Sequence, residues 1–180
     1  MTGTLVGKTA KMVQENMVIG WFQGRMEWGP RALRNRSILA NPGNPQAKEL
    51  LNEKVKHREK FRPFAPVVCE DDAFTYFECD NPIPAPTDFM LMVYPARKEW
   101  REKIPSVTHE DGSGRIQTMH RHQNPLYYDV IEEFWKKSGI PLLINTSFNI
   151  QGEPIICTPY DAYKCMMGQG LTPLSWAVSS

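Results

Sequence analysis

Continuous apolar runs and helically spaced apolar residues take turns along this chain, and their order predicts its secondary structure. The runs at residues 18–22 and 141–145 are typical of buried strands. Further strands are predicted at residues 37–40, 65–69, 89–94, 115–119 and 174–178. Helical spacing of apolar residues predicts helices at 8–17, 46–55, 70–77 and 125–137, and one that begins at Pro159 after an N-capping Thr158. This alternation favours an α/β fold with a mixed, twisted sheet, in a single domain over residues 1–180.

Composition narrows the class of protein. The chain is 41% hydrophobic and 23% charged, as soluble globular domains are, and no apolar run approaches the roughly 20 residues that span a bilayer. A formal charge of +1 means that any preference for anions must be local, and it does not suggest nucleic acid as the main partner. The four cysteines are scattered without a CxxC pair, which indicates neither a zinc site nor a disulfide framework. We therefore expect a cytoplasmic protein with reduced thiols.

The stretch at residues 24–36 (GRMEWGPRALRNR) gathers arginines directly after the strand at 18–22. Because Pro30 suits the first turn of a helix, the pattern predicts strand, tight turn and helix. Ligands of open α/β sheets bind beyond the carboxyl ends of strands, and guanidinium groups suit phosphate and carboxylate oxygens. An anion site is therefore predicted here. Two alternatives remain: a solvated basic helix face, and a turn that Glu27 holds by pairing with a nearby arginine.

A second basic stretch follows the helix predicted at 46–55. Residues 54–63 hold five cations and a histidine. Pro63 and Pro66 impose an extended path, on which Lys60 and Arg62 point the same way, as do Lys56 and Arg58 if the extension starts earlier. Such a Lys-x-Arg pair can hold a phosphate. The alternative is that these cations merely complement the dipole at the helix C-terminus.

Polar residues at two further strand ends are also candidates for anion binding. Ser147 and Asn149 follow the strand at 141–145, where they can bind phosphate or ribose, or simply cap a turn. Arg115 begins the strand at 115–119, either within reach of a ligand or as an exposed edge charge. The chain has no P-loop, no GxGxxG or GxSxG motif, and no His/Asp/Glu grouping at metal spacing. Chemistry by positioning and charge neutralisation is therefore favoured over an activated nucleophile.

Four segments carry a resemblance to a known family: GWFQGRMEWGPRALRNRSIL, KHREKFRPFAPVV, RIQTMHRHQNP and PLLINTSFNIQGEPIICTPYDA. They resemble the C-terminal domain of the O-carbamoyltransferases, which include nodulation-factor and antibiotic carbamoyltransferases. The resemblance covers residues from about 18 to about 170. It implies a YrdC-like domain: a mostly open, mixed sheet flanked by helices, with a concave basic face. It also implies conversion of carbamoyl phosphate and ATP, carried with Mg²⁺, into carbamoyl adenylate, without a tightly bound metal.

The resemblance also implies roles for individual residues. Its Lys-x-Arg…Ser-x-Asn signature ends here at Ser147 and Asn149, and begins at either Lys56 or Lys60. The residues implied to bind phosphates are Lys56, Arg58, Arg62 and Arg115, with Lys60 and Arg31 as further ligand contacts. Ser147 and Asn149 would hold nucleotide or carbamoyl oxygens, and Arg25 and Glu27 would shape the carbamoyl end. Arg34 departs from the family, which usually has glycine there; its guanidinium would either occlude the site or add a phosphate contact.

The family's other domain bears on what the chain does alone. The resemblance implies a kinase/glycopeptidase-like N-terminal domain that passes the carbamoyl group to an acceptor hydroxyl, and we expect that domain to be separate from this chain. Residues 1–16 are expected to form a leader helix. We therefore expect the chain alone to make at most the adenylate, as an excised domain or a split gene product. Two alternatives are a non-catalytic nucleotide or carbamoyl-phosphate binding module, and an RNA-binding or tRNA-modification domain.

Overall fold

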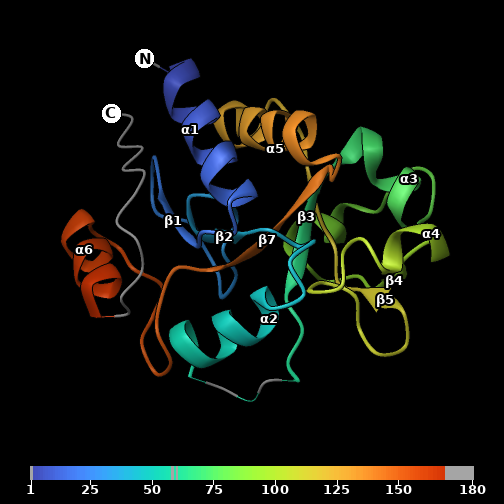
Figure 1. Ribbon diagram of the computed structural model, residues 1–180. Helices are drawn as coiled ribbons and strands as arrows, with labels where there is room; N and C mark the ends of the chain where they lie inside the picture. The colour runs from blue at the N-terminus through green and yellow to red at the C-terminus, as the bar shows by residue number, and fades with distance from the viewer. Residues whose placement is uncertain (1, 58, 60, 169–180) are drawn as a thin grey trace.

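A five-stranded mixed sheet forms the centre of the molecule (Figure 1). The computed structural model describes residues 2–57, 59 and 61–168. The sheet has the order β1-β2-β7-β3-β6. Its strands are β1 (Ile19–Phe22), β2 (Arg36–Ala40), β7 (Leu142–Ser147), β3 (Ala65–Cys69) and β6 (Gln117–Met119). Neighbouring strands are antiparallel except β3 and β6, which run parallel. The predicted strands at 18–22, 37–40, 65–69, 115–119 and 141–145 are confirmed.

Two helices cover one face of the sheet, α1 (Thr2–Gln14) and α5 (Pro125–Ser138), which lie against each other above the strands in Figure 1. Their apolar stripes bury Val6, Ala10 and Val13 from α1 together with Val130 and Phe134 from α5. The side chain of Asn124 caps α5, and Gly139 ends it in the left-handed conformation at φ 73°. The segment expected as a leader helix is thus part of the hydrophobic core.

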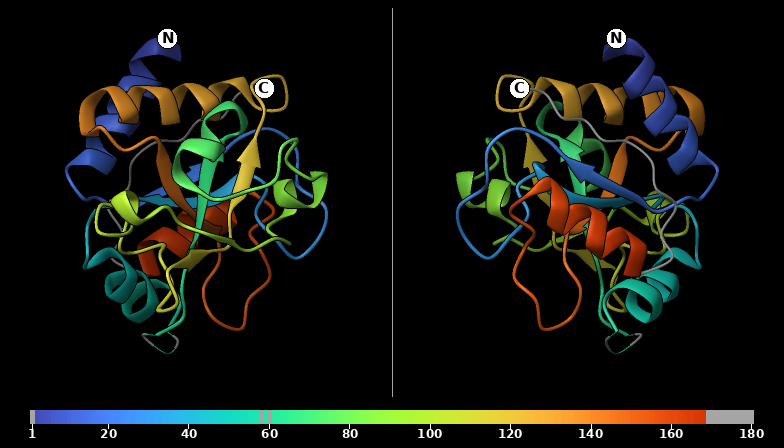
Figure 2. Two further views of the ribbon diagram at one scale, coloured as in Figure 1. Left: turned by 90° about the vertical axis from the view of Figure 1, so that its right-hand side faces the viewer. Right: turned by 90° about the vertical axis from the view of Figure 1, so that its left-hand side faces the viewer.

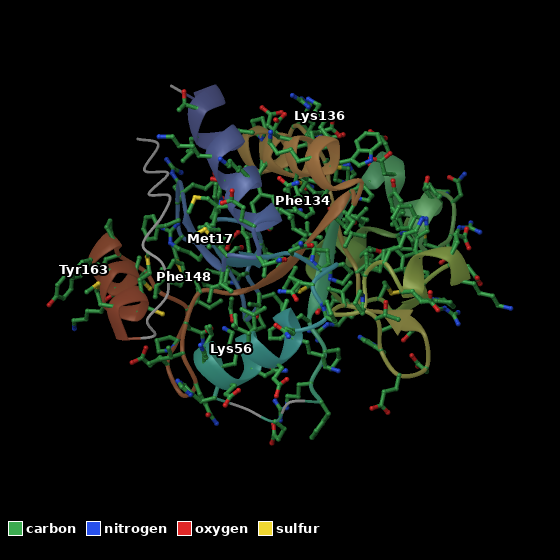
Figure 3. All side chains as sticks on the ribbon, in the orientation of Figure 1. Met17, Lys56, Phe134, Lys136, Phe148 and Tyr163 are labelled. Carbon is green, nitrogen blue, oxygen red and sulfur yellow. The ribbon has the colours of Figure 1, made fainter. Side chains whose placement is uncertain are left out.

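The opposite face is covered by α2 (Ala47–Leu50), which continues as the π-helix η1 (Leu51–Val55), and by α6 (Pro159–Gly168). The right-hand view of Figure 2 shows α6 lying across the strands. Thr158 caps α6 as predicted, because its hydroxyl accepts a hydrogen bond from the backbone N–H of Asp161 at 3.2 Å. Side chains on the two faces are seen in Figure 3, where Phe134 lies on α5 and Lys56 just past η1.

Short elements complete the molecule beside β3 and β6. They are η2 (Glu70–Asp72), α3 (Ala73–Tyr76), η3 (Ala85–Phe89), β4 (Tyr94–Pro95), α4 (Lys98–Arg101) and β5 (Ser113–Gly114). β4 and β5 pair as a separate two-stranded sheet. All four cysteines are free thiols. Within the described part of the chain, no helix has both the length and the apolar character needed to cross a membrane.

Two predicted elements are wrong. No helix follows Pro30: residues 23–35 form an irregular loop joining the antiparallel strands β1 and β2. The apolar run at 89–94 is not a strand, because η3 ends at Phe89 and Met90 then turns left-handed at φ 59°. Phe89, Leu91 and Val93 are exposed, whereas Met90 and Tyr94 are buried, and the strand β4 begins only at Tyr94. The strand predicted at 174–178 lies outside the described residues.

Candidate functional site

Six of the residues predicted to bind ligands line a cavity of about 270 Å³ beside the middle of the sheet. Its wall comes from the end of β7, the start of β3 and the connecting segments around them. Its lining includes Arg31, Ala32, Lys56, Glu59, Arg62, Met90, Arg115, Asn145, Ser147 and Asn149. Because β7 and β3 are antiparallel, the cavity lies at the carboxyl end of one and the amino end of the other. The sequence predicted a site beyond the carboxyl ends of strands. The cavity meets this expectation at β7, but at β3 it lies at the amino end of the strand.

Lys56 connects the π-helix to the end of β7. Its backbone N–H donates to Leu51 O at 2.9 Å, five residues back, and this wider turn brings a buried side chain against the strand. The ammonium donates to four oxygens of two residues: Ser147 O at 2.5 Å, Ser147 Oγ at 3.1 Å, Asn149 O at 3.0 Å and Asn149 Oδ1 at 2.7 Å. Lys56, which begins one of the two possible Lys-x-Arg pairs, thus contacts both polar residues of the Ser-x-Asn segment.

Ser147 and Asn149 are also bonded to each other. The Ser147 hydroxyl donates to Asn149 Oδ1 at 2.6 Å, and Asn149 Nδ2 donates to Glu153 O at 2.8 Å. Together with Lys56 these bonds fix both side chains at the cavity wall. Lys56 therefore orients the polar groups at the end of β7, in addition to the charge that it brings to the cavity.

Three arginines add positive charge around the same cavity. Arg115 is half-buried, and burial, followed by the charge of Arg31, lowers the pKa of its guanidinium. Arg31 is exposed at the edge of the 23–35 loop. Arg62 is exposed too, and its Nε lies 2.9 Å from Glu59 Oε2, an ion pair at the surface. An anion between Arg31 and Arg115 would relieve their mutual repulsion, because opposite charge favours the ionised form of each.

Glu27 holds the loop that carries Arg31. Its carboxylate accepts hydrogen bonds from the backbone N–H groups of Asn35 at 2.8 Å and Arg36 at 3.2 Å. Burial raises the pKa of Glu27, and the backbone donors oppose that shift. Arg25 is exposed, and its carbonyl accepts from Asn35 Nδ2 at 3.1 Å. Neither Arg25 nor Glu27 lines the cavity, so the turn-holding alternative describes Glu27, with backbone amides as its partners.

The unusual Arg34 points away from the cavity and does neither of the two things expected of it. It is buried, and its guanidinium donates to Thr118 O at 2.8 Å and to Leu33 O at 2.9 Å. It neither lines the cavity nor blocks it. Its backbone has φ 88°, a conformation that glycine adopts without strain, and glycine is the residue that the resemblance led us to expect there. Burial lowers the pKa of the Arg34 guanidinium, and the negative charge of Asp88 partly offsets this shift.

Asn145 is a lining residue that the sequence analysis did not select. It lies on β7, two residues before Ser147, and is 1% exposed. Its Nδ2 donates to Gln117 Oε1 at 2.5 Å and to Ala32 O at 3.2 Å. The only signal in the sequence was an amide at the end of an otherwise apolar run.

The structure thus brings six of the predicted site residues to one cavity: Arg31, Lys56, Arg62, Arg115, Ser147 and Asn149. Arg58 and Lys60, also predicted, lie outside the described residues. The roles of all of these residues stay predictions, because the geometry gives their positions and not their ligands.

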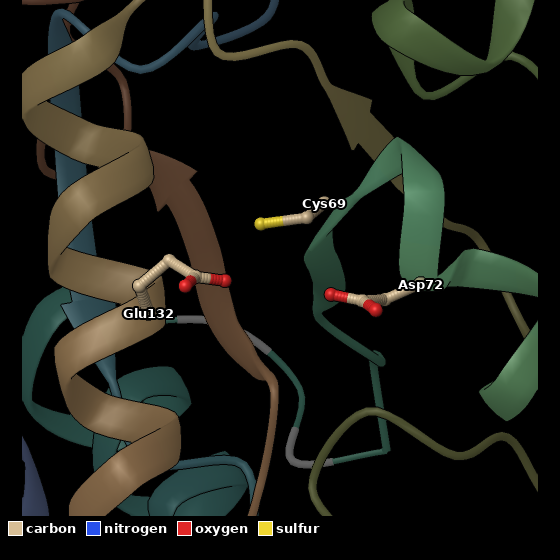
Figure 4. Close-up of side chains that lie close together, drawn as sticks. All are labelled: Cys69, Asp72 and Glu132. Atoms are coloured by element: carbon tan, nitrogen blue, oxygen red, sulfur yellow. The ribbon is translucent and has the colours of Figure 1, made fainter.

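At the other end of β3, three potential metal ligands converge (Figure 4). Cys69 ends the strand, Asp72 lies in η2 and Glu132 comes from α5, and their ligand atoms lie within 4.8 Å of one another. Sequence spacing did not predict this grouping, because Glu132 is distant along the chain from Cys69 and Asp72. Burial raises the pKa of the Cys69 thiol to about 12, so it stays protonated at neutral pH. Metals bind the thiolate, so a metal ion at this cluster would have to displace the thiol proton.

Similar folds among solved structures define the class of the domain. The crystal structure of full-length HypF, in the phosphate- and nucleotide-bound form, matches with a TM-score of 0.61 and 16% identity over 91% of this chain and 20% of that chain. The structure of P. abyssi Sua5 complexed with L-threonine matches with a TM-score of 0.62 and 14% identity, over 91% of this chain and 44% of that chain. At such identity they show the fold alone, which is YrdC-like, as predicted.

The family follows from sequence. The family model described as Carbamoyltransferase C-terminus matches residues 10–176, and the chain belongs to this family. The nodulation protein NolNO of Sinorhizobium fredii is 46% identical over 94% of this chain and 25% of its own length. NolO of Bradyrhizobium diazoefficiens is 45% identical over 94% of this chain and 31% of its length. An uncharacterised protein of Synechocystis, sll1178, is 44% identical over 91% of this chain and 29% of its own length. The chain therefore spans only 25–31% of the length of these curated relatives.

Proposed function

We propose that this chain binds carbamoyl phosphate and ATP with Mg²⁺ and forms carbamoyl adenylate, which a separate domain or subunit uses to carbamoylate an acceptor hydroxyl. The observation that carries the proposal is the convergence of Arg31, Lys56, Arg62 and Arg115 on the cavity beside Ser147. Membership of the carbamoyltransferase family supports the group transferred, and the greater length of the relatives supports a second domain.

The proposed reaction consumes one water molecule. Water releases inorganic phosphate from carbamoyl phosphate and leaves carbamate. A carbamate oxygen then attacks the α-phosphorus of ATP, and the bond to the β-phosphate oxygen breaks. The products are carbamoyl adenylate, pyrophosphate and inorganic phosphate. Every species carries phosphate or carboxylate charge, so a site made of cations lowers the barrier by positioning reactants and neutralising their charge.

The lining suits phosphoanions better than a free metal ion. Glu59 is the sole carboxylate among the described lining residues, and it is paired with Arg62. Mg²⁺ commonly binds through substrate phosphates and keeps several waters, so it would arrive on the triphosphate of ATP. Arg31 and Arg115 would contact the phosphates, while Lys56 keeps Ser147 and Asn149 in place beside them. A cavity of about 270 Å³ would hold the charged groups, with the nucleoside extending past its rim.

Pyrophosphate release by the purified chain tests this proposal. We expect release that needs both ATP and carbamoyl phosphate, and kcat/KM about 10- to 150-fold lower in Arg115→Ala, because a charged hydrogen bond contributes about 1.5–3 kcal/mol. Arg121→Ala is the matched control: Arg121 is exposed, pairs with Asp129 at 2.5 Å and does not line the cavity. Heat protection by ATP without turnover would indicate the non-catalytic binding module. If the chain shows no turnover and ATP gives it no heat protection, the nucleotide site is refuted.

A further inference from the structure

Two buried side-chain amides, of Gln117 and Asn145, form a hydrogen-bonded series that ends at the cavity wall. Gln117 on β6 donates through Nε2 to Asp88 O at 3.0 Å and to Ala32 O at 3.3 Å. Its Oε1 accepts from Asn145 Nδ2 at 2.5 Å, which also donates to Ala32 O at 3.2 Å. Gln117 and Asn145 are 0% and 1% exposed. Two side-chain amides are thus connected in series across β3, the strand that lies between β6 and β7.

This series fixes which way the Asn145 amide faces. Carbonyl oxygens only accept, so Asp88 O and Ala32 O hold the NH₂ group of Gln117 and leave its oxygen toward Asn145. That oxygen and Ala32 O in turn require the NH₂ group of Asn145. If either side-chain amide were turned around, its oxygen would face another acceptor oxygen, and no hydrogen bond could form there. The remaining atom, Asn145 Oδ1, is therefore an acceptor by necessity.

Asn145 Oδ1 is left without a hydrogen-bond partner by the part of the chain that the structure describes. It is buried and accepts no hydrogen bond from the described residues. Among those residues, Asn145 is the only one that both lines the cavity and leaves a buried side-chain polar atom unpaired. Such an atom costs about 1–3 kcal/mol, so native structures keep few of them, and one beside a ligand cavity points to a donor on the ligand.

We propose that Asn145 Oδ1 accepts a hydrogen bond from the –NH₂ group of the carbamoyl moiety and selects carbamoyl phosphate over acyl phosphates that lack an N–H. This inference rests on the proposed function and adds the basis of its substrate specificity. Phosphate oxygens are acceptors and match the cations, so they cannot pair with Oδ1. The carbamoyl amino group is a donor and lies one carbon and one oxygen from phosphorus, whereas the amino group of adenine is separated from the phosphates by a whole nucleoside.

Acetyl phosphate is the matched probe, because a methyl group replaces the amino group at nearly the same size. A site built around a substrate N–H rejects the analogue without it, since its own polar group is then left unpaired. We expect the wild-type chain to prefer carbamoyl phosphate over acetyl phosphate about 10- to 100-fold, in pyrophosphate release and in binding measured by heat protection. Asn145→Ala should lose most of this preference, with carbamoyl phosphate weakened and acetyl phosphate changed little.

Three further measurements make the result decisive. Protection of Asn145→Ala by ATP alone shows that the variant is folded. Gln117→Met, which removes the acceptor that orients Asn145, should reduce the preference by a smaller factor. Inosine triphosphate lacks the amino group of adenine, so if Asn145→Ala weakens ATP but not inosine triphosphate, Oδ1 binds adenine and the carbamoyl assignment is wrong. An unchanged preference in Asn145→Ala would overturn the inference.

Adenylate formation and the role of Asn145 can be refuted independently of each other. If the wild-type chain binds carbamoyl phosphate but releases no pyrophosphate, adenylate formation is refuted, while the comparison of binding still decides the role of Asn145. If carbamoyl phosphate binds no better than acetyl phosphate, the inference on Asn145 is refuted whatever the turnover.

Discussion

Replacing Lys56 with methionine should destabilise the whole domain. Methionine preserves the buried stem but removes the ammonium that donates to four oxygens of Ser147 and Asn149 at 2.5–3.1 Å. An ammonium has three N–H groups, so three full hydrogen bonds are the most it can make. At about 1.5 kcal/mol each, the lower bound for charged hydrogen bonds, they would contribute about 4–5 kcal/mol.

Two effects reduce that loss. Removing a buried charge recovers part of its desolvation cost, and the freed oxygens lie at a cavity wall where water can reach them. We therefore expect the free energy of unfolding to fall by about 2–4 kcal/mol, which for a chain of this size corresponds to a melting temperature lower by about 4–16 °C.

Urea denaturation measures the change, with Lys54→Met as the matched control. Lys54 is exposed on the π-helix that ends just before Lys56, so its substitution should change stability by less than about 0.5 kcal/mol. A Lys56→Met variant as stable as the Lys54→Met control would show that the ammonium does not hold the end of β7, and would contradict the role given to it here.

Three more predictions follow from the same structure. Arg34→Gly should be about 1 kcal/mol more stable than Arg34→Ala in urea denaturation, because both lose the bond to Thr118 O but only glycine relaxes the backbone at φ 88°; equal stability would rule out strain. Gly20→Ala should cost about 1–3 kcal/mol, since a Cβ would meet two ring carbons of Phe148 at 2.5 and 2.8 Å, whereas Gly3→Ala meets nothing within 4 Å and serves as control. Burial lowers the pKa of His109 in the folded state, so the unfolded chain takes up the proton first as pH falls below about 6.5. The stability due to His109 is therefore present above that pH and lost below it, and the slope of unfolding free energy against pH should be shallower in His109→Gln; an unchanged slope would contradict the shift.

The sequence predicted the sheet better than its surroundings. The sequence located all five strands of the large sheet, whose residues are buried except for the last two of β7. The run at 89–94 was misleading: Asp88 accepts hydrogen bonds from Thr118 at 2.5 Å and Gln123 at 3.1 Å, which hold the segment in a turn. No helix forms after Pro30, and the backbone N–H groups of Asn35 and Arg36 bond to the Glu27 carboxylate instead of to helical carbonyl groups.

The candidate site was predicted by residue type but not by contact. Cations, hydroxyls and amides near strand ends indicated an anion site, and six of the named residues do share one cavity. The local pattern could not reveal that Lys56 is bound to residues 91 and 93 positions away, or that Arg34 turns inward. Asn145 was missed for the same reason, since its orientation depends on Gln117, a partner 28 residues earlier on another strand.

The central place of β7 has a consequence for how the site responds to ligands. With β2 on one side and β3 on the other, its amide protons should exchange with solvent only when the whole domain unfolds, whereas those of the 23–35 loop exchange through local opening. The floor of the cavity is then already ordered before any substrate arrives. Binding free energy is spent on ordering the rim, where Arg31 lies, and deuterium uptake should fall on ligand addition in that loop while β7 stays unchanged.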